Sequence, residues 1–389
     1  MGSKLEKAIW LPNDIIGVVM ESLSARDLKQ CSLVCHSWRP YAQPLLFDQV
    51  TVNVSFRIRS YNFFTVLRRR DLRAFLTSNP ERGGLFKHIK CTSNIDDITS
   101  MIPVIHHCTQ LRSLTLSCSL APPLLQQIGL QNFPMLKKLT LLDAPSFEAV
   151  TQCIKSMSGA HAWEDLSLSL AKEYTARSSD IPPGQPISFP SVQAFSLYNA
   201  HRPSAAVMSE LLASLHPMLM SLSRLVVQTS GFYSADILQL VEDNVTTLRS
   251  LDVAQVFDAD DLLPRVLRNR VLQDIVLRLP VLPDAVAAYL ASLETIFSDP
   301  QNFTAVRRAS FVISSTYGLL DMGDHCDSWT RLSEFLSRFP YLEMVTLFLE
   351  RSDGDWGFQS MYISVDDLDV HPAFESLRRM GRLLVANYS

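Results

Sequence analysis

Two cysteines four positions apart, Cys31 and Cys35, are followed directly by His36, and these residue types bind zinc or exchange disulfides. A zinc site needs four ligands, and no second cysteine pair follows at finger-like spacing, so at least one ligand is missing. The same segment carries apolar residues at the three-and-four spacing of one helix face: Leu28, Cys31, Val34, Cys35 and Trp38. Because a free cysteine packs as a small hydrophobic residue, we interpret both cysteines as part of this stripe and expect no metal site.

A second group of reactive residue types is His106, His107 and Cys108, which precedes an apolar run and is typical of the end of a helix. The chain has no glycine-rich phosphate loop, no GxSxG nucleophile elbow and no HExxH motif. The sequence therefore predicts a protein that is not an enzyme and has no cofactor. An enzyme built on a repeat scaffold is the rival class.

The composition limits the possible partners. The 389 residues carry 35 basic and 39 acidic side chains, a formal net charge of -4, which gives no overall electrostatic attraction for nucleic acid or for an anionic membrane. The chain has no apolar run of about eighteen residues and no signal-peptide pattern, and its seven cysteines are an odd number in apolar surroundings. We therefore expect reduced thiols, no membrane or nucleic-acid partner, and a location in the cytoplasm, the nucleus or both rather than secretion.

Short helices must position the stripe around Cys31. Pro12 fits the first position of a helix whose apolar side holds Ile15, Ile16, Val19 and Leu23. Ser24 is a plausible cap for a second helix, and Cys31 or Ser32 is expected to open a third. Three helices in so short a segment bury too little of their own apolar surface, which implies that a partner covers it.

The residues of this segment resemble an F-box over residues 9–50: Leu11, Pro12, Asp14 to Ile16, Val19, Leu23, Asp27, Leu28, Cys31 to Cys35, Trp38 and Arg39. F-boxes dock on the Skp-family adaptor of cullin-RING ubiquitin ligases, so the resemblance implies an adaptor-binding surface drawn from Leu11, Pro12, Ile15, Ile16, Leu28, Val34, Cys35 and Trp38. The alternative is that these residues form the core of an ordinary helical cap on the rest of the chain.

A short apolar sequence pattern repeats through the rest of the chain, from about residue 85 onward. The pattern Leu-x-x-Leu-x-Leu, with substitutions, recurs as LRSLTL at Leu111, LKKLTL at Leu136, LSRLVV at Leu222, LRSLDV at Leu248 and LEMVTL at Leu342, among others. Several copies are followed by apolar residues at helical spacing, so the sequence predicts an α/β fold. We expect an irregular leucine-rich-repeat solenoid over residues 85–389, with a curved parallel sheet and outer helices. This part of the chain resembles the C-terminal regions of fungal F-box proteins. In four repeats the asparagine or cysteine expected after the strand is replaced by Ser119, Ala144, Ala171 and Ser230, so the asparagine ladder is missing and the regularity of the turns stays open.

Residues 51–84 join the F-box segment, residues 1–50, to the repeats, and we expect a linker helix that packs on the solenoid. The linker is rich in arginine, with Arg57, Arg59, Arg68, Arg69, Arg70 and Arg73. It is either an anion or phosphopeptide site or a solvated helix face, and the pattern favours the solvated face.

The pattern also predicts the outward face of the sheet, because the third, fifth and seventh positions of each strand point away from the core. Client-binding candidates on this face are Tyr198, Arg224, Asp252, Asp274, Arg278, Arg308 and Phe348. The leading hypothesis is a substrate-recruiting adaptor subunit of an SCF-type ligase, with the Skp adaptor and an unidentified client protein as partners. A non-degradative scaffold bound to Skp is the alternative.

Overall fold

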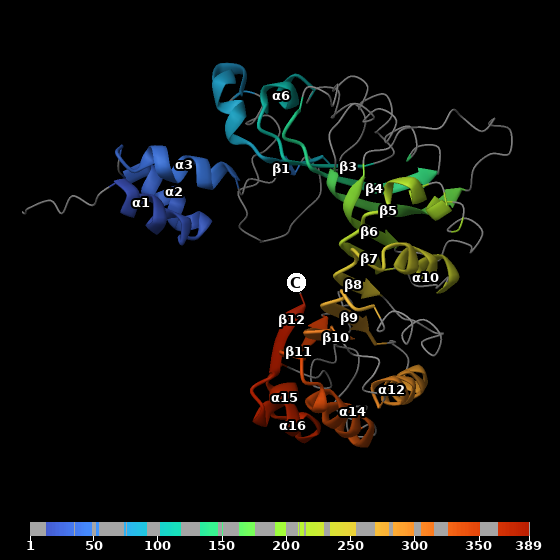
Figure 1. Ribbon diagram of the computed structural model, residues 1–389. Helices are drawn as coiled ribbons and strands as arrows, with labels where there is room; N and C mark the ends of the chain where they lie inside the picture. Colours follow the sequence, from blue (N-terminus) through green and yellow to red (C-terminus); the bar gives the residue numbers. More distant parts are fainter. Residues whose placement is uncertain are drawn as a thin grey trace, which may run out of the picture. The chain divides into compact units, whose positions relative to one another are not determined.

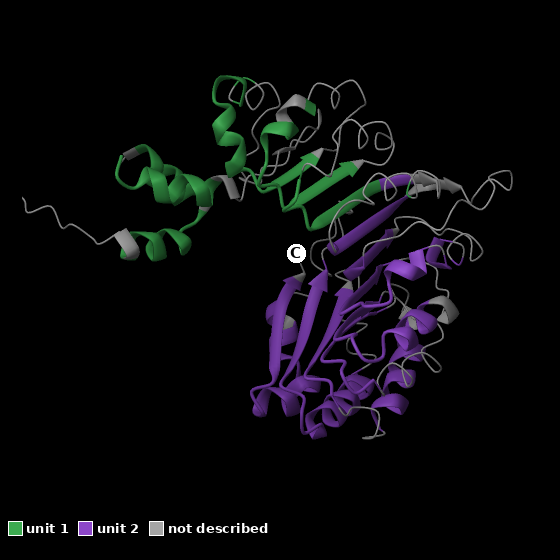
Figure 2. Ribbon diagram, turned by 45° about the horizontal axis from the view of Figure 1, so that its top comes forward, with its two compact units in different colours: residues 1–142, 149–161 green, residues 143–148, 162–389 purple. Residues whose placement is uncertain are grey.

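The computed structural model describes residues 13–34, 36–48, 52–53, 74, 76–91, 102–117, 133–146, 150, 163–175, 191–199, 209, 211–213, 215–228, 234–253, 269–279, 283–298, 305–314, 326–350 and 365–388. The chain forms two compact units (Figure 2): the first holds residues 1–142 and 149–161, and the second holds residues 143–148 and 162–389. Of the helices in the described ranges, none combines the length and apolar character needed to cross a bilayer.

The first unit begins with three helices, α1 (Asn13–Glu21), α2 (Ala25–Val34) and α3 (Arg39–Asp48). Ser24 caps α2 as expected, since its Oγ accepts a hydrogen bond from the Asp27 backbone N–H at 3.3 Å. The three helices share a buried core of Ile16, Met20, Leu28 and Ala42, against which Leu23, Cys31, Trp38, Tyr41, Leu45 and Leu46 pack. This small core is what fixes the relative positions of α1 and α2.

The expected start of the third helix at Cys31 or Ser32 is wrong. The helix α2 continues to Val34, and α3 begins only at Arg39. The Ser32 hydroxyl donates to the Lys29 carbonyl oxygen at 2.8 Å, so it is bonded within the helix and is not available as a cap. Pro40 lies in the first turn of α3, where the missing N–H costs nothing.

Four parallel strands follow in the first unit: β1 (Val52–Asn53), β2 (His88–Cys91), β3 (Ser113–Ser117) and β4 (Lys138–Ser146), which runs across the boundary between the units. Two short helices precede β2 and β3, namely η1 (Pro80–Leu85) and α6 (Ile102–His107). They pack so closely that a Cβ on Gly83 would lie 2.1 Å from the His107 carbonyl oxygen. His106 and His107 end α6, as their position in the sequence indicated.

The second unit has eight parallel strands, each paired with the next along the chain. They are β5 (Trp163–Thr175), β6 (Val192–Asn199), β7 (Arg224–Gln228), β8 (Ser250–Val253), β9 (Asp274–Arg278), β10 (Arg308–Ser314), β11 (Met344–Glu350) and β12 (Leu383–Tyr388). Parallel strands in sequence order, with helices between them, are the arrangement of a repeat solenoid. The predicted α/β class is therefore confirmed.

Helices cover one side of this sheet. Figure 1 shows α10 (Ser234–Asp243), α12 (Pro283–Phe297) and α14 (Cys326–Arg338) on the same side of the strands. The chain then closes with α15 (Val365–Val370), η7 (Pro372–Phe374) and α16 (Glu375–Arg379) before β12. Trp329 of α14 is buried and meets Phe311 of β10 and Phe374 of η7 edge to face, with ring centroids 6.1 and 5.4 Å away. Aromatic packing thus fills the core behind the last strands.

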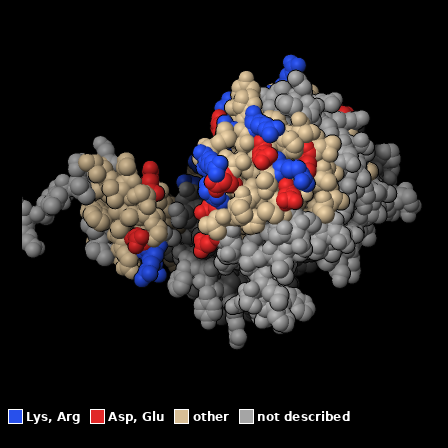
Figure 3. All heavy atoms as spheres, turned by 90° about the horizontal axis from the view of Figure 1, so that it is seen from below, with Lys and Arg blue, Asp and Glu red and all other residues tan. Residues whose placement is uncertain are grey.

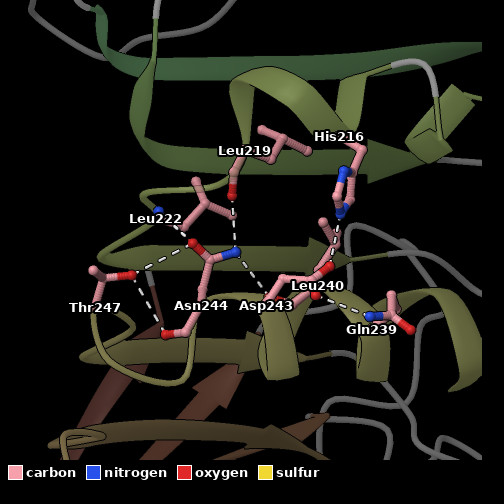
Figure 4. A network of polar contacts seen from close by, with 8 residues as sticks. All are labelled: His216, Leu219, Leu222, Gln239, Leu240, Asp243, Asn244 and Thr247. Atoms are coloured by element: carbon pink, nitrogen blue, oxygen red, sulfur yellow. Dashed lines mark hydrogen bonds and ion pairs between the residues drawn. The ribbon is translucent and has the colours of Figure 1, made fainter.

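Neighbouring repeats are also joined by a buried amide, that of Asn244 (Figure 4). Its Nδ2 donates to the backbone oxygens of Leu219 and Leu240, both at 2.8 Å, and its Oδ1 accepts from the Leu222 N–H at 2.7 Å. Leu219 and Leu222 precede β7, whereas Asn244 lies in the turn before β8. One side chain therefore satisfies the backbone of its own repeat and of the one before, in place of the missing asparagine ladder.

Candidate binding surfaces

The helix α1 leaves an apolar face uncovered. Ile15, Val18 and Val19 are 48, 69 and 43% exposed and follow the three-and-four spacing of one helix side. On α2, Leu33 is 69% exposed. Three large apolar side chains exposed within five residues of α1 indicate a surface for another molecule, and Leu33 adds an exposed apolar side chain on α2. We refer to Ile15, Val18, Val19 and Leu33 as the apolar helix surface.

The residues predicted to contact an adaptor fall into three groups. Ile15 belongs to the apolar helix surface, whereas Ile16 and Leu28 lie in the core of the three helices and Trp38 packs against that core half-buried. Leu11, Pro12 and Cys35 lie outside the described residues, and the side chain of Val34 does too. The described members thus include one exposed side chain, Ile15, and three that form or support the helical core.

Sequence reasoning did not include Val18 and Leu33 among the adaptor-binding residues, although both are 69% exposed and Ile15, which it did include, is 48% exposed. Val18 follows Ile15 by three positions, a spacing that could have placed both on one face. Leu33 precedes Val34 and Cys35, so its exposure depends on how α2 turns against the core, which periodicity alone does not determine.

Of the residues that suggested metal chemistry, the structure describes Cys31, His36, His106, His107 and Cys108, whereas Cys35 lies outside the described residues. Cys31 packs against the helical core, Cys108 is buried, and both are free thiols. His36 is exposed in the turn before α3. Within the described ranges, no group of three or more histidine, cysteine, aspartate or glutamate side chains lies close enough to hold a metal ion.

The strand register places the candidate client-binding residues on one face of the second unit's sheet. Arg224 is followed across the ladder by Ser250, Asp274, Arg308 and Met344, and the next outward row contains Asp252. Tyr198 pairs with Gln228, and Arg278 pairs with Val312 and then Phe348. Residues two apart on a strand point to the same side, so these rows share the face opposite the helices.

Four of these seven residues form two ion pairs, Arg278 with Asp252 and Arg308 with Asp274. Arg278 and Asp252 are only 8 and 6% exposed, with Arg278 Nε 3.4 Å from Asp252 Oδ1 and Arg278 Nη1 3.3 Å from Glu350 Oε1. Gln228 Nε2 donates to the other Asp252 oxygen at 3.2 Å. Because a buried ion pair loses its partners' hydration, this network is more suited to fixing the sheet than to exchanging its bonds for a client's.

The second pair joins Arg308 and Asp274 through two parallel bonds, with Arg308 Nη2 2.8 Å from Asp274 Oδ2. The hydrogen bonds and charge of Asp274 raise the pKa of the Arg308 guanidinium above its ordinary value. Tyr198, Arg224 and Phe348 complete the set: Tyr198 and Arg224 are exposed on β6 and β7, and Phe348 is half-buried on β11.

Ion pairing extends over the rest of the second unit. Arg307 pairs with Glu343, Arg331 with Glu294 and Arg379 with Glu375, at 3.2, 2.8 and 2.8 Å. On the face drawn in Figure 3, blue and red atoms lie next to each other at several places. These ion pairs neutralise the charges of their members locally.

Comparison with known protein families identifies a domain in the segment that contains the first three helices. A family model described as the F-box domain matches residues 9–43, which include α1 and α2 and the start of α3. F-box domains bind Skp-type adaptors of cullin-RING ubiquitin ligases. No curated protein sequence is similar enough to this chain to count as a match.

Among solved structures, the chain is similar to a leucine-rich repeat-containing protein, LegL7 from Legionella pneumophila. The two are 12% identical, the match covers 85% of this chain and 97% of that one, and the TM-score is 0.42. The family match shows that the chain carries an F-box domain at residues 9–43. Parallel strands that pair in sequence order follow this domain.

Proposed function

We propose that this chain is the substrate-recruiting subunit of an SCF-type cullin-RING ubiquitin ligase. In this proposal residues 1–50 dock on a Skp-family adaptor, residues 51–84 link the two parts, and residues 85–389 hold a client protein. The repeats would place the chain with the fungal F-box proteins that its sequence resembles. We expect it to act in the cytoplasm, the nucleus or both, where such ligases work.

The observation that carries the proposal is the coincidence of the F-box match with the apolar helix surface. The match covers residues 9–43, and the same stretch exposes Ile15, Val18, Val19 and Leu33 although its own core is formed. Removing such side chains from water contributes roughly 25 cal/mol per Å² of apolar area. A partner that covers this surface therefore gains most of its docking energy there, with Ile16 and Leu28 holding the helices in place.

No catalytic group of the chain's own is needed for this role. A client held on the repeats lies close to the ubiquitin-carrying enzyme that other subunits bring, which raises its effective concentration and favours transfer. The rate of ubiquitin transfer would then depend on how well the chain positions the client relative to the adaptor and its ligase.

The proposal is tested by co-purification from cells. Val18→Asp with Leu33→Asp places charges on the apolar helix surface without touching the buried core, and should abolish co-purification with the Skp-family adaptor. The matched control is Val245→Asp with Val370→Asp, because these side chains are 49 and 73% exposed in the second unit. Equal recovery of the adaptor with both double variants would reject the proposal.

Client fate is a separate question for the same cells. Proteins recovered with the wild type under proteasome inhibition, and lost with a variant of the repeats, are client candidates. The proposal expects their half-lives to lengthen when the chain is deleted. Unchanged half-lives would instead support a non-degradative scaffold bound to Skp.

A further inference from the structure

The last strand, β12, carries the apolar repeat pattern but lacks the cover that earlier strands have. Met380, Leu383 and Val385 hold the first, fourth and sixth positions of the pattern, in register with Val345 and Leu347 of β11. At these three positions the residues of β7 to β11, and of the turns before them, are at most 2% exposed. Met380 is instead 48% exposed, and Leu383 and Val385 are half-buried. Because each repeat covers the apolar side chains of its neighbour, the core of the repeats stays open at β12.

Every second residue of β12 bonds to β11 through its backbone. The Val345 N–H donates to the Arg382 oxygen at 2.7 Å, so the backbone of Arg382 faces β11. In a parallel ladder, residues two apart on a strand turn their N–H and C=O groups toward the same neighbour, and Leu384 and Ala386 therefore face β11 as well. The residues between them turn their backbone groups to the opposite edge.

This outer edge of β12 carries the backbone groups of Leu383, Val385 and Asn387. Among the described strands, β12 is the last in the sheet and pairs only with β11 (Figure 1). Proteins usually protect such an edge with a lysine, a proline or a very short strand. The strand β1, at the other end of the strand order, is only two residues long, whereas the six residues of β12, LLVANY, include no charge and no proline. The edge of β12 is therefore suited to pairing with another strand.

The side chains of β12 determine which strand fits. Leu383 and Val385 lie on the core side, in register with the buried Val345 and Leu347, while Leu384 lies on the other side and is 49% exposed. A strand that covers this edge must therefore be uncharged and apolar at three successive positions, so that both faces match. The segment Leu383–Val385 has this composition itself, which makes two copies of β12 complementary to each other.

We propose that two copies of this chain associate through β12, whose strands pair antiparallel about a two-fold axis at Leu384. In this register Leu383 of one copy lies opposite Val385 of the other and exchanges both backbone hydrogen bonds with it. The two Leu384 side chains then meet on the outward face, and no like charges are brought together. A register centred on Val385 would set Leu383 against the polar Asn387 instead.

A two-fold pair fits this edge better than a head-to-tail stack. Stacking would set β12 of one copy against β1 of the next, and β1 offers only two residues to a contact that repeats without closing. The two-fold pair uses the same open edge on both copies and closes. A contact of one six-residue strand from each copy is small beside the roughly 1,200 Å² that stable interfaces bury, so we expect a reversible dimer with a micromolar dissociation constant. This inference goes beyond the proposed function, because it needs neither the adaptor nor a client.

Sedimentation velocity of the purified full chain, over about 1 to 100 μM, tests for the dimer. The parent chain carries Val18→Asp and Leu33→Asp, so that the apolar helix surface does not mediate self-association and the result does not depend on the adaptor. We expect a reversible equilibrium between monomer and dimer. A monomer at every concentration, or a mass that grows beyond the dimer, would overturn the inference.

Matched lysine variants locate the contact. Leu384→Lys in the parent chain places two like charges opposite each other at the two-fold axis and should raise the dissociation constant at least about tenfold. The control is Val245→Lys, because Val245 is also 49% exposed but lies in the turn before β8. We expect the control to change the dissociation constant by less than about twofold. An equal effect of the two variants would contradict pairing at β12.

Disulfide cross-linking tests the register. The two Leu384 residues form a pair whose backbones face away from each other, with Cα atoms about 4.5 Å apart, which is within reach of a disulfide. Leu384→Cys should therefore give a covalent dimer under mild oxidation. Asn387→Cys is the control on the same strand, because its two copies lie about 20 Å apart in this register.

The parent chain under the same oxidant gives the background from its own thiols, of which Cys31 and Cys326 are partly exposed. We expect a covalent dimer above this background for Leu384→Cys and none for Asn387→Cys. Cross-linking of Asn387→Cys alone, or of neither variant, would reject the proposed pairing. Neither outcome bears on adaptor docking, because the cysteine positions lie in β12 and the docking residues lie in α1 and α2.

Discussion

Asn244 shows what a single residue contributes to this fold. Its amide lies almost fully buried and bonds three backbone groups of two neighbouring repeats. The sequence indicated that the usual asparagine ladder is missing, and it gave no sign that this asparagine, in a turn before β8, takes over part of that task. The reason is that its partners, Leu219 and Leu222, lie in the preceding repeat and are brought near only by strand pairing.

Replacing Asn244 with leucine should therefore destabilise the second unit. The change leaves the Leu222 N–H and the Leu219 oxygen buried without their partner, at about 1–3 kcal/mol for each unsatisfied group, whereas the Leu240 oxygen keeps its bond from the residue 244 backbone N–H. Denaturant unfolding would show a lower midpoint. Thr246→Ala, an exposed change in the same turn, serves as the control. A midpoint equal to the control's would contradict the assigned role.

The neighbouring pair of His216 and Asp243 predicts a pH effect. His216 Nε2 lies 2.6 Å from Asp243 Oδ2, and this bond is the main reason that the pKa of Asp243 is below its ordinary value of 3.8. A carboxylate with a depressed folded-state pKa contributes stability above its unfolded pKa and loses it as pH falls through the folded value. Asp243→Asn should thus be less stable than wild type near neutral pH, and the difference in unfolding free energy should shrink as pH falls below 3.8 and disappear below the lower folded-state pKa. A difference that persists in stronger acid would count against this pair.

The charged residues on the sheet show that a repeat pattern can predict which side of the sheet a residue lies on but not which residue it binds. The period of two places Asp252, Asp274, Arg278 and Arg308 on the outward side, where a client could meet them. It does not reveal that they bind each other, because Arg278 reaches Asp252 on the neighbouring strand and Glu350 two strands away. Pairing across a sheet is set by the register, which a repeat pattern does not specify residue by residue.

At the scale of elements, the sequence predicted strands and helices better than it predicted their ends. Leu111, Leu136, Leu222, Leu248 and Leu342 are all buried just before a strand, as the repeat required. The third helix was placed too early, because a serine within α2 resembles a cap and only the Ser32 bond to Lys29 shows that it is not one. Local capping signals are ambiguous wherever the side chain can bond backward into its own helix.

The contact between η1 and α6 leaves no room for a side chain at Gly83. A Cβ on Gly83 would meet the His107 backbone, whereas one on Gly84 would make ordinary contacts at 3.7 Å. Gly83→Ala should therefore separate η1 from α6 and destabilise the first unit by about 1–3 kcal/mol, and Gly84→Ala should not. Hydrogen exchange at the amides of β2 and β3 measures this locally. Equal protection in the two variants would contradict the packing described.

At the scale of the whole molecule, the chain has two kinds of segment. A helical segment exposes apolar side chains, and a set of repeats with polar faces follows it in the sequence. The F-box resemblance was readable from the residue types between Leu11 and Arg39, and the match at residues 9–43 confirms it. The exposure of Val18 and Leu33 was not readable, since it depends on which sides of α1 and α2 the shared core occupies. A ligase subunit needs both features, one surface for the adaptor and one for the client.

The central claim is that another protein completes the apolar helix surface. Calorimetric titration of the purified full chain with a purified Skp-family adaptor tests it most directly. We expect saturable binding with a negative heat-capacity change, the mark of buried apolar area, and no detectable binding by the chain carrying Val18→Asp and Leu33→Asp. The account is contradicted if the wild-type chain does not bind the adaptor, or if the double variant binds it with unchanged affinity.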